Sequence, residues 1–169
     1  MSAPRNVAIQ RAMHLVLDQN FPFQVTGIPW PRDLQITPLA RLASHLIRDY
    51  DDWQVLDELA HRGDVDGFIT NDADMLNLPT EMVVLRDTHL ILVVTDHVGH
   101  DPLRATGLLM VHLPTILKQP VGKPNIYILR PGQLTPTSPD VQINKIASRQ
   151  GVPPPHVIAQ ERRRIGRGG

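Results

Sequence analysis

The chain has 169 residues, of which 41% are hydrophobic, and it carries 17 basic and 17 acidic side chains. This length supports one well-buried core and is short for two full domains. Cysteine is absent, which excludes disulfides, thiolate metal sites and thiol nucleophiles and leaves oxygen and imidazole ligands for a metal. Hard cations such as Mg²⁺ or Mn²⁺ are then the natural choice.

Hydropathy and charge indicate where the protein works. No apolar run approaches the roughly 18 residues of a membrane span, and residues 1–18 lack the apolar core of a signal peptide. We therefore expect a cytoplasmic protein with no membrane contact. Residues 140–169 carry six basic and two acidic side chains, against 11 and 15 before them, so a mildly acidic body precedes a basic tail.

Strand-like and helix-like segments alternate along residues 7–130. A first strand is expected within residues 7–17, followed by a proline-rich loop over 21–31. Apolar spacing predicts helices at residues 34–48, 52–62 and 102–117, and apolar runs predict strands at 65–70, 81–85, 89–95 and 124–129. This alternation is typical of an α/β domain with a parallel sheet.

The last part of the chain changes character. Prolines recur through residues 131–139 and 153–155, around a possible helix at 141–149, and a basic run occupies 161–167. We expect residues 131–169 to form a proline-rich, basic extension outside the core, partly helical or disordered.

Two of the predicted strands end in carboxylates. Asp18 follows the first strand, and Asp72 and Asp74 follow the strand at 65–70. In an open α/β sheet both strand ends lie at the carboxyl edge, where such folds bind ligands. Each acid also has a structural interpretation, as a turn former for Asp18 and as helix-start residues for Asp72 and Asp74. The two roles can coexist, because a carboxylate fixed at a helix start can still bind a cation.

A third acid comes from the helix at 52–62. At roughly 100° per residue, Asp52 lies on the apolar face with Val55, Leu56 and Leu59, whereas Asp57 and Glu58 point away. A carboxylate on a buried face is costly unless it is paired or binds a metal. Asp52 could instead be the N-cap, but Asp51, with Gln54 three residues later, has capping-box spacing and can cap the helix itself.

Candidate substrate contacts flank these acids. Thr70 and Asn71 precede Asp72, and His97, His100 and Arg104 follow the strand at 89–95. Arg104 near a helix start is a candidate phosphate contact, whereas histidines in a glycine-containing loop are more often simply solvated. We take Arg104, Thr70, Asn71 and His97 as the predicted substrate-binding residues.

Together these segments resemble the PIN-like nuclease superfamily, which includes toxin ribonucleases and RNA-processing enzymes. The resemblance rests on LVLDQN at residues 15–20, the helix at 52–60 and FITNDADML at 68–76, and it covers residues 13–129. It implies a three-layer α/β/α sandwich around a mostly parallel sheet and cleavage of RNA with Mg²⁺ or Mn²⁺. Asp18, Asp52 and Asp72 would be the metal ligands and catalytic acids, with Asp74 as a fourth. The middle acid is often glutamate in that family, and the proline-rich loop after the first strand is a second departure.

The predicted function is a metal-dependent endoribonuclease in which clustered aspartates hold the cation that activates water. Residues 7–130 would form the PIN-like nuclease domain, with RNA as substrate. The resemblance to toxins also allows an antitoxin-like protein partner and a homodimer. The alternative is a noncatalytic PIN-like module that binds nucleic acid or protein, with the basic tail as its contact surface.

Overall fold

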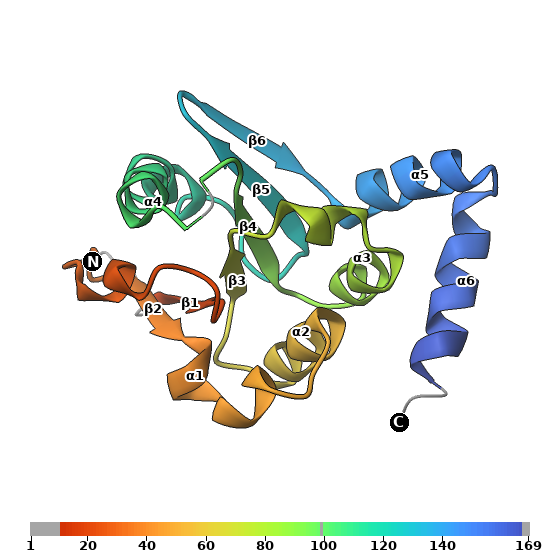
Figure 1. Cartoon of the computed structure of the whole chain (residues 1–169), viewed down its shortest axis with the longest axis horizontal. Coiled ribbons are helices and arrows are strands. Elements are labelled where there is room, and N and C mark those ends of the chain that lie inside the picture. Colours follow the sequence, from red (N-terminus) through yellow and green to blue (C-terminus); the bar gives the residue numbers. More distant parts are fainter. Residues whose placement is uncertain (1–10, 99, 167–169) are drawn as a thin grey trace, which may run out of the picture.

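A computed structural model describes residues 11–98 and 100–166 of the chain (Figure 1). Its sheet has six strands in the order β2-β1-β3-β4-β5-β6, in which only β5 and β6 pair antiparallel. The strands are β1 (Met13–Leu17), β2 (Leu34–Pro38), β3 (Gly67–Thr70), β4 (Ile91–Thr95), β5 (Asn125–Arg130) and β6 (Gln133–Thr137). The helices are α1 (Leu39–Leu42), α2 (Asp52–His61), α3 (Pro79–Arg86), α4 (Pro102–Ile116), α5 (Pro139–Gln150) and α6 (Pro154–Ile165), with short 3-10 turns η1 (Phe23–Gly27), η2 (Ser44–Ile47) and η3 (Ala73–Asn77).

Helices cover both faces of the sheet, and each face has its own apolar cluster. One cluster joins α1, α2, α3, α5 and α6 to the sheet, and the other joins α4 and η1 to it. Figure 1 shows the strands passing between α4 on one side and α2 and α3 on the other. The predicted α/β class with a mostly parallel sheet is confirmed, and the layering is consistent with a three-layer sandwich.

The central strands read as continuous apolar runs because they are covered on both faces. Every residue of β1, β3 and β4 is buried. Gly67 begins β3 where a side chain would not fit, since a Cβ there would lie 2.6 Å from the carbonyl oxygen of Ile91. The close approach of β3 and β4 fixes the register that places Thr70 opposite Val94.

Two predicted elements are wrong. Residues 34–38 form the edge strand β2 rather than the start of a helix, and only short helical turns follow them. Residues 81–85 lie in helix α3, which begins at Pro79, rather than in a strand. Residues 80–85 are all buried, because α2, α5 and α6 pack around α3. A helix buried on all sides has no polar face and therefore no 3.6-residue signal.

The expected extension outside the core is also wrong for residues 131–166. β6 pairs with β5, and Ile143, Ile146 and Val157 are buried in the cluster that contains α3. Arg162 of α6 makes a bidentate ion pair with Asp87 at 2.8 Å. Figure 1 shows α6 on the far side of α3 from the central strands. The partly helical character predicted for this region is confirmed by α5 and α6.

Some expectations lie outside the described residues, namely the first strand over residues 7–10 and the basic character of Arg167. Within residues 11–98 and 100–166, no helix is both long and apolar enough to cross a membrane.

Candidate active site

The carboxyl ends of β1 and β3 bring Asp18 and Asp72 to one edge of the sheet. Leu17 lies opposite Ile69 in the parallel register, and the Asp18 backbone N–H donates to the Ile69 carbonyl at 2.9 Å. The backbone therefore continues the pairing one residue beyond β1. The two acids, 54 positions apart in sequence by their numbers, leave adjacent strands in the same direction, as the sequence predicted.

The hydroxyl of Thr70 connects these two acids. Its Oγ1 donates to Asp18 Oδ2 at 2.9 Å and accepts from the Asp72 backbone N–H at 3.0 Å. Thr70 is only 1% exposed, and its hydroxyl is occupied on both sides. Thr70 therefore positions the two acids. This geometry favours that role over the predicted contact of Thr70 with substrate.

Burial and neighbouring charge act on Asp18. Burial is the largest effect and raises the pKa of the Asp18 carboxyl, and the charge of Asp72 raises it further. The hydrogen bond from Thr70 and those from the backbone of Gln19 and Asn20 oppose this rise. The side chain is thus held in place by several donors while its negative charge remains unfavourable.

Helix α2 adds Asp52 to the same group. As predicted, its buried residues are Val55, Leu56 and Leu59, and the capping box is present, with the Asp51 N–H donating to Gln54 Oε1 at 2.8 Å. Burial raises the pKa of Asp52, and Asp18 and then Asp72 add to the rise. The structure therefore brings Asp18, Asp52 and Asp72 within electrostatic range of one another. We call these three residues the acid cluster.

Asp74 borders the acid cluster through its backbone. Its carboxyl is exposed, and its backbone N–H donates to Asp72 Oδ1 at 3.0 Å, which makes Asp72 the N-cap of η3. Among the described residues, the acids that raise the pKa of Asp52 are Asp18, Asp72 and Asp51, and Asp74 is not one of them. A role for Asp74 as a fourth ligand remains a prediction.

Glu81 is an acid near this group that the sequence interpretation missed. It lies in the first turn of α3, is 7% exposed, and has a raised pKa that is caused first by burial and then by Asp52 and Asp51. Its own backbone N–H and Arg164 of α6 lower that pKa. A single acid inside an apolar run was the available signal, because buried carboxylates require partners.

The donors of the acid cluster suit a hard cation, but their spacing does not yet form a coordination shell. Carboxylate oxygens are the ligands of Mg²⁺ and Mn²⁺, and among the described residues no Arg, Lys or His forms an ion pair with Asp18, Asp52 or Asp72. Within the described ranges, however, no three Asp, Glu or His side chains form a group that could hold a metal as they stand. The chemistry of these acids therefore fits a hard cation, whereas their arrangement is not that of a formed ligand group.

The next strand end, after β4, carries a different kind of polar group. Asp96 is 8% exposed and accepts from Nε and Nη2 of Arg130, both at 2.7 Å. His97 follows in the left-handed region (φ 61°) with its side chain 82% exposed. The Arg104 side chain is also largely exposed, 3.4 Å from Asp101, which caps α4. The predicted substrate contacts His97 and Arg104 are thus accessible, whereas Asn71 donates to the carbonyl of Asn20 at 3.3 Å.

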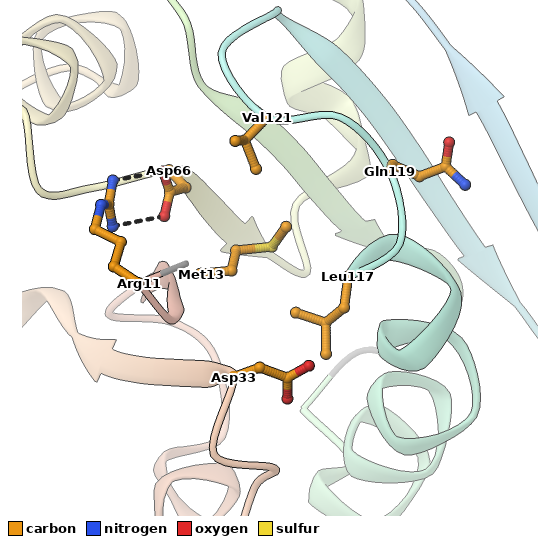
Figure 2. Close-up of a pocket in the computed structure, with 7 residues that line it drawn as sticks. All are labelled: Arg11, Met13, Asp33, Asp66, Leu117, Gln119 and Val121. Carbon is orange, nitrogen blue, oxygen red and sulfur yellow. Dashed lines mark hydrogen bonds and ion pairs between the residues drawn. The ribbon is translucent and has the colours of Figure 1, made fainter. Parts of the chain in front are cut away.

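A hollow lies at the opposite edge of the sheet, near the amino ends of β1 and β3 (Figure 2). It has a volume of about 210 Å³ and is lined in part by Arg11, Met13, Asp33 and Asp66. Arg11 pairs with both oxygens of Asp66 at 2.7 and 2.9 Å, and Asp66 also accepts from the His14 backbone N–H. These bonds hold β1 beside the start of β3, so the side chains of Arg11 and Asp66 serve the structure.

Comparison with known proteins adds no relative: no family model, curated protein or solved structure matches the chain.

Proposed function

We propose that this protein is a metal-dependent endoribonuclease that hydrolyses RNA phosphodiester bonds at the acid cluster. The observation that carries the proposal is the position of Asp18 and Asp72 after adjacent strands at one sheet edge, where the Thr70 hydroxyl links them. Asp52 of α2 joins them because the charges of both acids act on its carboxyl. The resemblance to PIN-like nucleases supplies the reaction class, and Asp18, Asp52 and Asp72 would hold Mg²⁺ or Mn²⁺.

A bound cation would supply a water activated near neutral pH and would neutralise charge developing on the phosphate. The residues of the chain prepare for this. Thr70 fixes the orientation of Asp18, and the capping box of α2 is formed by Asp51 and Gln54, which leaves Asp52 free of the capping task. Burial first, and then the charge of neighbouring acids, raises the pKa values of Asp18 and Asp52, and a cation would offset both effects.

A noncatalytic PIN-like module that binds nucleic acid or protein is the second candidate. One observation favours it: within residues 11–98 and 100–166, no ready-made metal-holding group is found. The version in which the basic tail makes the contact is weakened, because Arg149 donates to Asn77 and Arg162 pairs with Asp87. Those side chains are already engaged with the protein.

The test is cleavage of mixed RNA by the wild type and by Asp72→Asn in Mg²⁺ or Mn²⁺, with a chelator control. Asparagine can keep the bond from the Asp74 N–H through Oδ1, so the variant should remain folded. The matched control is Asp57→Asn, at an exposed position of α2 that points away from the cluster. We expect chelator-sensitive cleavage that Asp72→Asn abolishes and Asp57→Asn preserves. Full activity in folded Asp72→Asn would refute the proposed site.

A further inference from the structure

A second hollow opens beside the carboxyl end of β4, between α4 and the turn that joins β5 to β6. Its volume is about 610 Å³, and its lining includes His97, Val98, Arg104, Gly107, Leu108 and Val111. A volume between 300 and 1,000 Å³ is usual for small-molecule sites. We call this space the α4 hollow.

The α4 hollow lies close to the acid cluster along the sheet edge. Thr70 lies opposite Val94 in the register of β3 and β4. Asp72 and Asp96 therefore each follow that pair by two residues, on strands that are about 4.8 Å apart where they pair. Asp96 itself lines the hollow. A chain of nucleotides that crosses the edge at the acid cluster can reach the hollow with its neighbouring unit.

The lining combines three features that a nucleotide needs. Val98, Leu108 and Val111 give it an apolar wall, and the exposed imidazole of His97 can stack on a base, as histidines do in proteins that bind single strands. The exposed Arg104 guanidinium can donate to a phosphate. The negative charge of Asp96, the acid in the lining, is paired with Arg130 at 2.7 Å, so it repels a phosphate less.

Two backbone features are otherwise unexplained by packing. His97 adopts a left-handed conformation (φ 61°) that is uncommon outside glycine, and such conformations cluster at ligand sites. Gly107 occupies the middle of α4, where glycine is unfavourable relative to alanine. A Cβ at Gly107 would meet no atom of the described residues within 4 Å, so contacts with them do not require glycine there. The missing side chain keeps the hollow open.

We infer that the α4 hollow binds one unpaired nucleotide of a single-stranded nucleic acid next to the bond cleaved at the acid cluster. His97 stacks on the base and Arg104 contacts the phosphate. The base must be unpaired, because a base held in a duplex cannot enter a hollow of this kind. The inference rests on the proposed function for the identity of the neighbouring site, whereas nucleotide binding is measurable without cleavage.

The experiment measures binding of adenosine 5′-monophosphate, ribose 5-phosphate and inorganic phosphate to the full chain by titration calorimetry. The blocking variant is Gly107→Leu, which fills the hollow, and its Cβ meets no atom of the part of the chain that the structure describes. Its matched control is Thr115→Leu, an exposed position of α4 outside the hollow. A third variant, Arg104→Gln, removes the guanidinium.

We expect adenosine 5′-monophosphate to bind more tightly than ribose 5-phosphate, and Gly107→Leu to weaken it by about tenfold or more, as loss of one stacked base does. Thr115→Leu should bind like the wild type, and Arg104→Gln should lower affinity for all three phosphates. Equal affinity for the nucleotide and for ribose 5-phosphate, or nucleotide binding unchanged in Gly107→Leu, would overturn the inference.

Competition and cleavage with a single-stranded hexamer and its duplex complete the test. The single strand should displace the nucleotide from the wild type and the duplex should not; displacement by both alike also overturns the inference. If the wild type binds the nucleotide, Gly107→Leu does not, and the wild type cleaves no RNA, the nucleotide site in the hollow is supported and the nuclease proposal is refuted. If the wild type cleaves RNA but binds no nucleotide, the nuclease proposal is supported and the nucleotide site is refuted.

Discussion

Replacing Thr70 with valine should lower both stability and activity. Valine has the same shape, so the change removes only the hydroxyl that donates to Asp18 (2.9 Å) and accepts from the Asp72 N–H (3.0 Å). A hydrogen bond to a charged group contributes about 1.5–3 kcal/mol. Losing the bond that the hydroxyl accepts from the Asp72 N–H costs less stability, because Asp72 is exposed and water can replace that bond. We therefore expect a loss of about 2 kcal/mol, which lowers the melting temperature by roughly 4–8 °C in a protein of this size.

The assay is thermal and urea unfolding of the wild type, Thr70→Val and the control Thr70→Ser. Serine keeps the hydroxyl and loses one buried methyl group, so it should cost about 1 kcal/mol and retain more cleavage activity than valine. A valine variant at least as stable and active as the serine variant would show that the hydroxyl does not hold the two acids.

Two further predictions concern charge. Asp52→Asn should stabilise the metal-free protein at pH 7 by up to about 1 kcal/mol, the scale of half-exposed charge interactions. Because the pKa of Asp52 is raised in the folded protein, its protonated form favours folding. This stabilising contribution is present below the ordinary pKa of 3.8 and is lost as the pH rises through the raised value. The stabilisation gained by Asp52→Asn should therefore disappear toward pH 3. Separately, Arg162→Gln should reduce stability by about 0.2–1 kcal/mol, and Asp87→Asn by somewhat more, because it also removes the ion pair of Asp87 with Arg86. The double variant should lose little more than Asp87→Asn alone, because Arg162 and Asp87 share one exposed ion pair.

Unfolding curves from pH 3 to 8 test the first of these, with Asp57→Asn as the control. A stabilisation by Asp52→Asn that is independent of pH would contradict its electrostatic origin. RNA affinity separates the structural role of Arg162 from a role in binding. If Arg162→Gln weakened RNA binding while Asp87→Asn did not, the C-terminal contact surface of the noncatalytic alternative would be supported.

The elements that carry the acid cluster were accessible from the sequence because each has an unambiguous local signal. β1 and β3 are apolar runs that end in a polar residue, and α2 has a capping box and a two-sided pattern. The helical wheel alone placed Asp52 on the face with Val55 and Leu59. The position of one acid on a helix could therefore be predicted before any tertiary contact was known.

The rest depended on tertiary packing that local patterns do not encode. Residues 80–85 are buried on every side, so α3 resembled a buried strand and Glu81 could not be assigned a face. β2 is an edge strand with one buried residue, Leu34, and shows no clear alternation. The bridging role of Thr70 joins residues that are 52 positions apart, which requires the strand order rather than the sequence around either residue.

The packing of α6 on α3 also imposes an order in time. Thr80 donates to Glu161 at 2.6 Å across 81 residues, and both side chains are buried. At synthesis rates of about 5–20 residues per second, roughly 4–16 s separate these two residues on the ribosome. During that interval α3, which follows Asp72 and carries Glu81, has been made without the helix that covers it. The packing around α3 is therefore completed only after α6 has been made, when every acid of the cluster has already been incorporated.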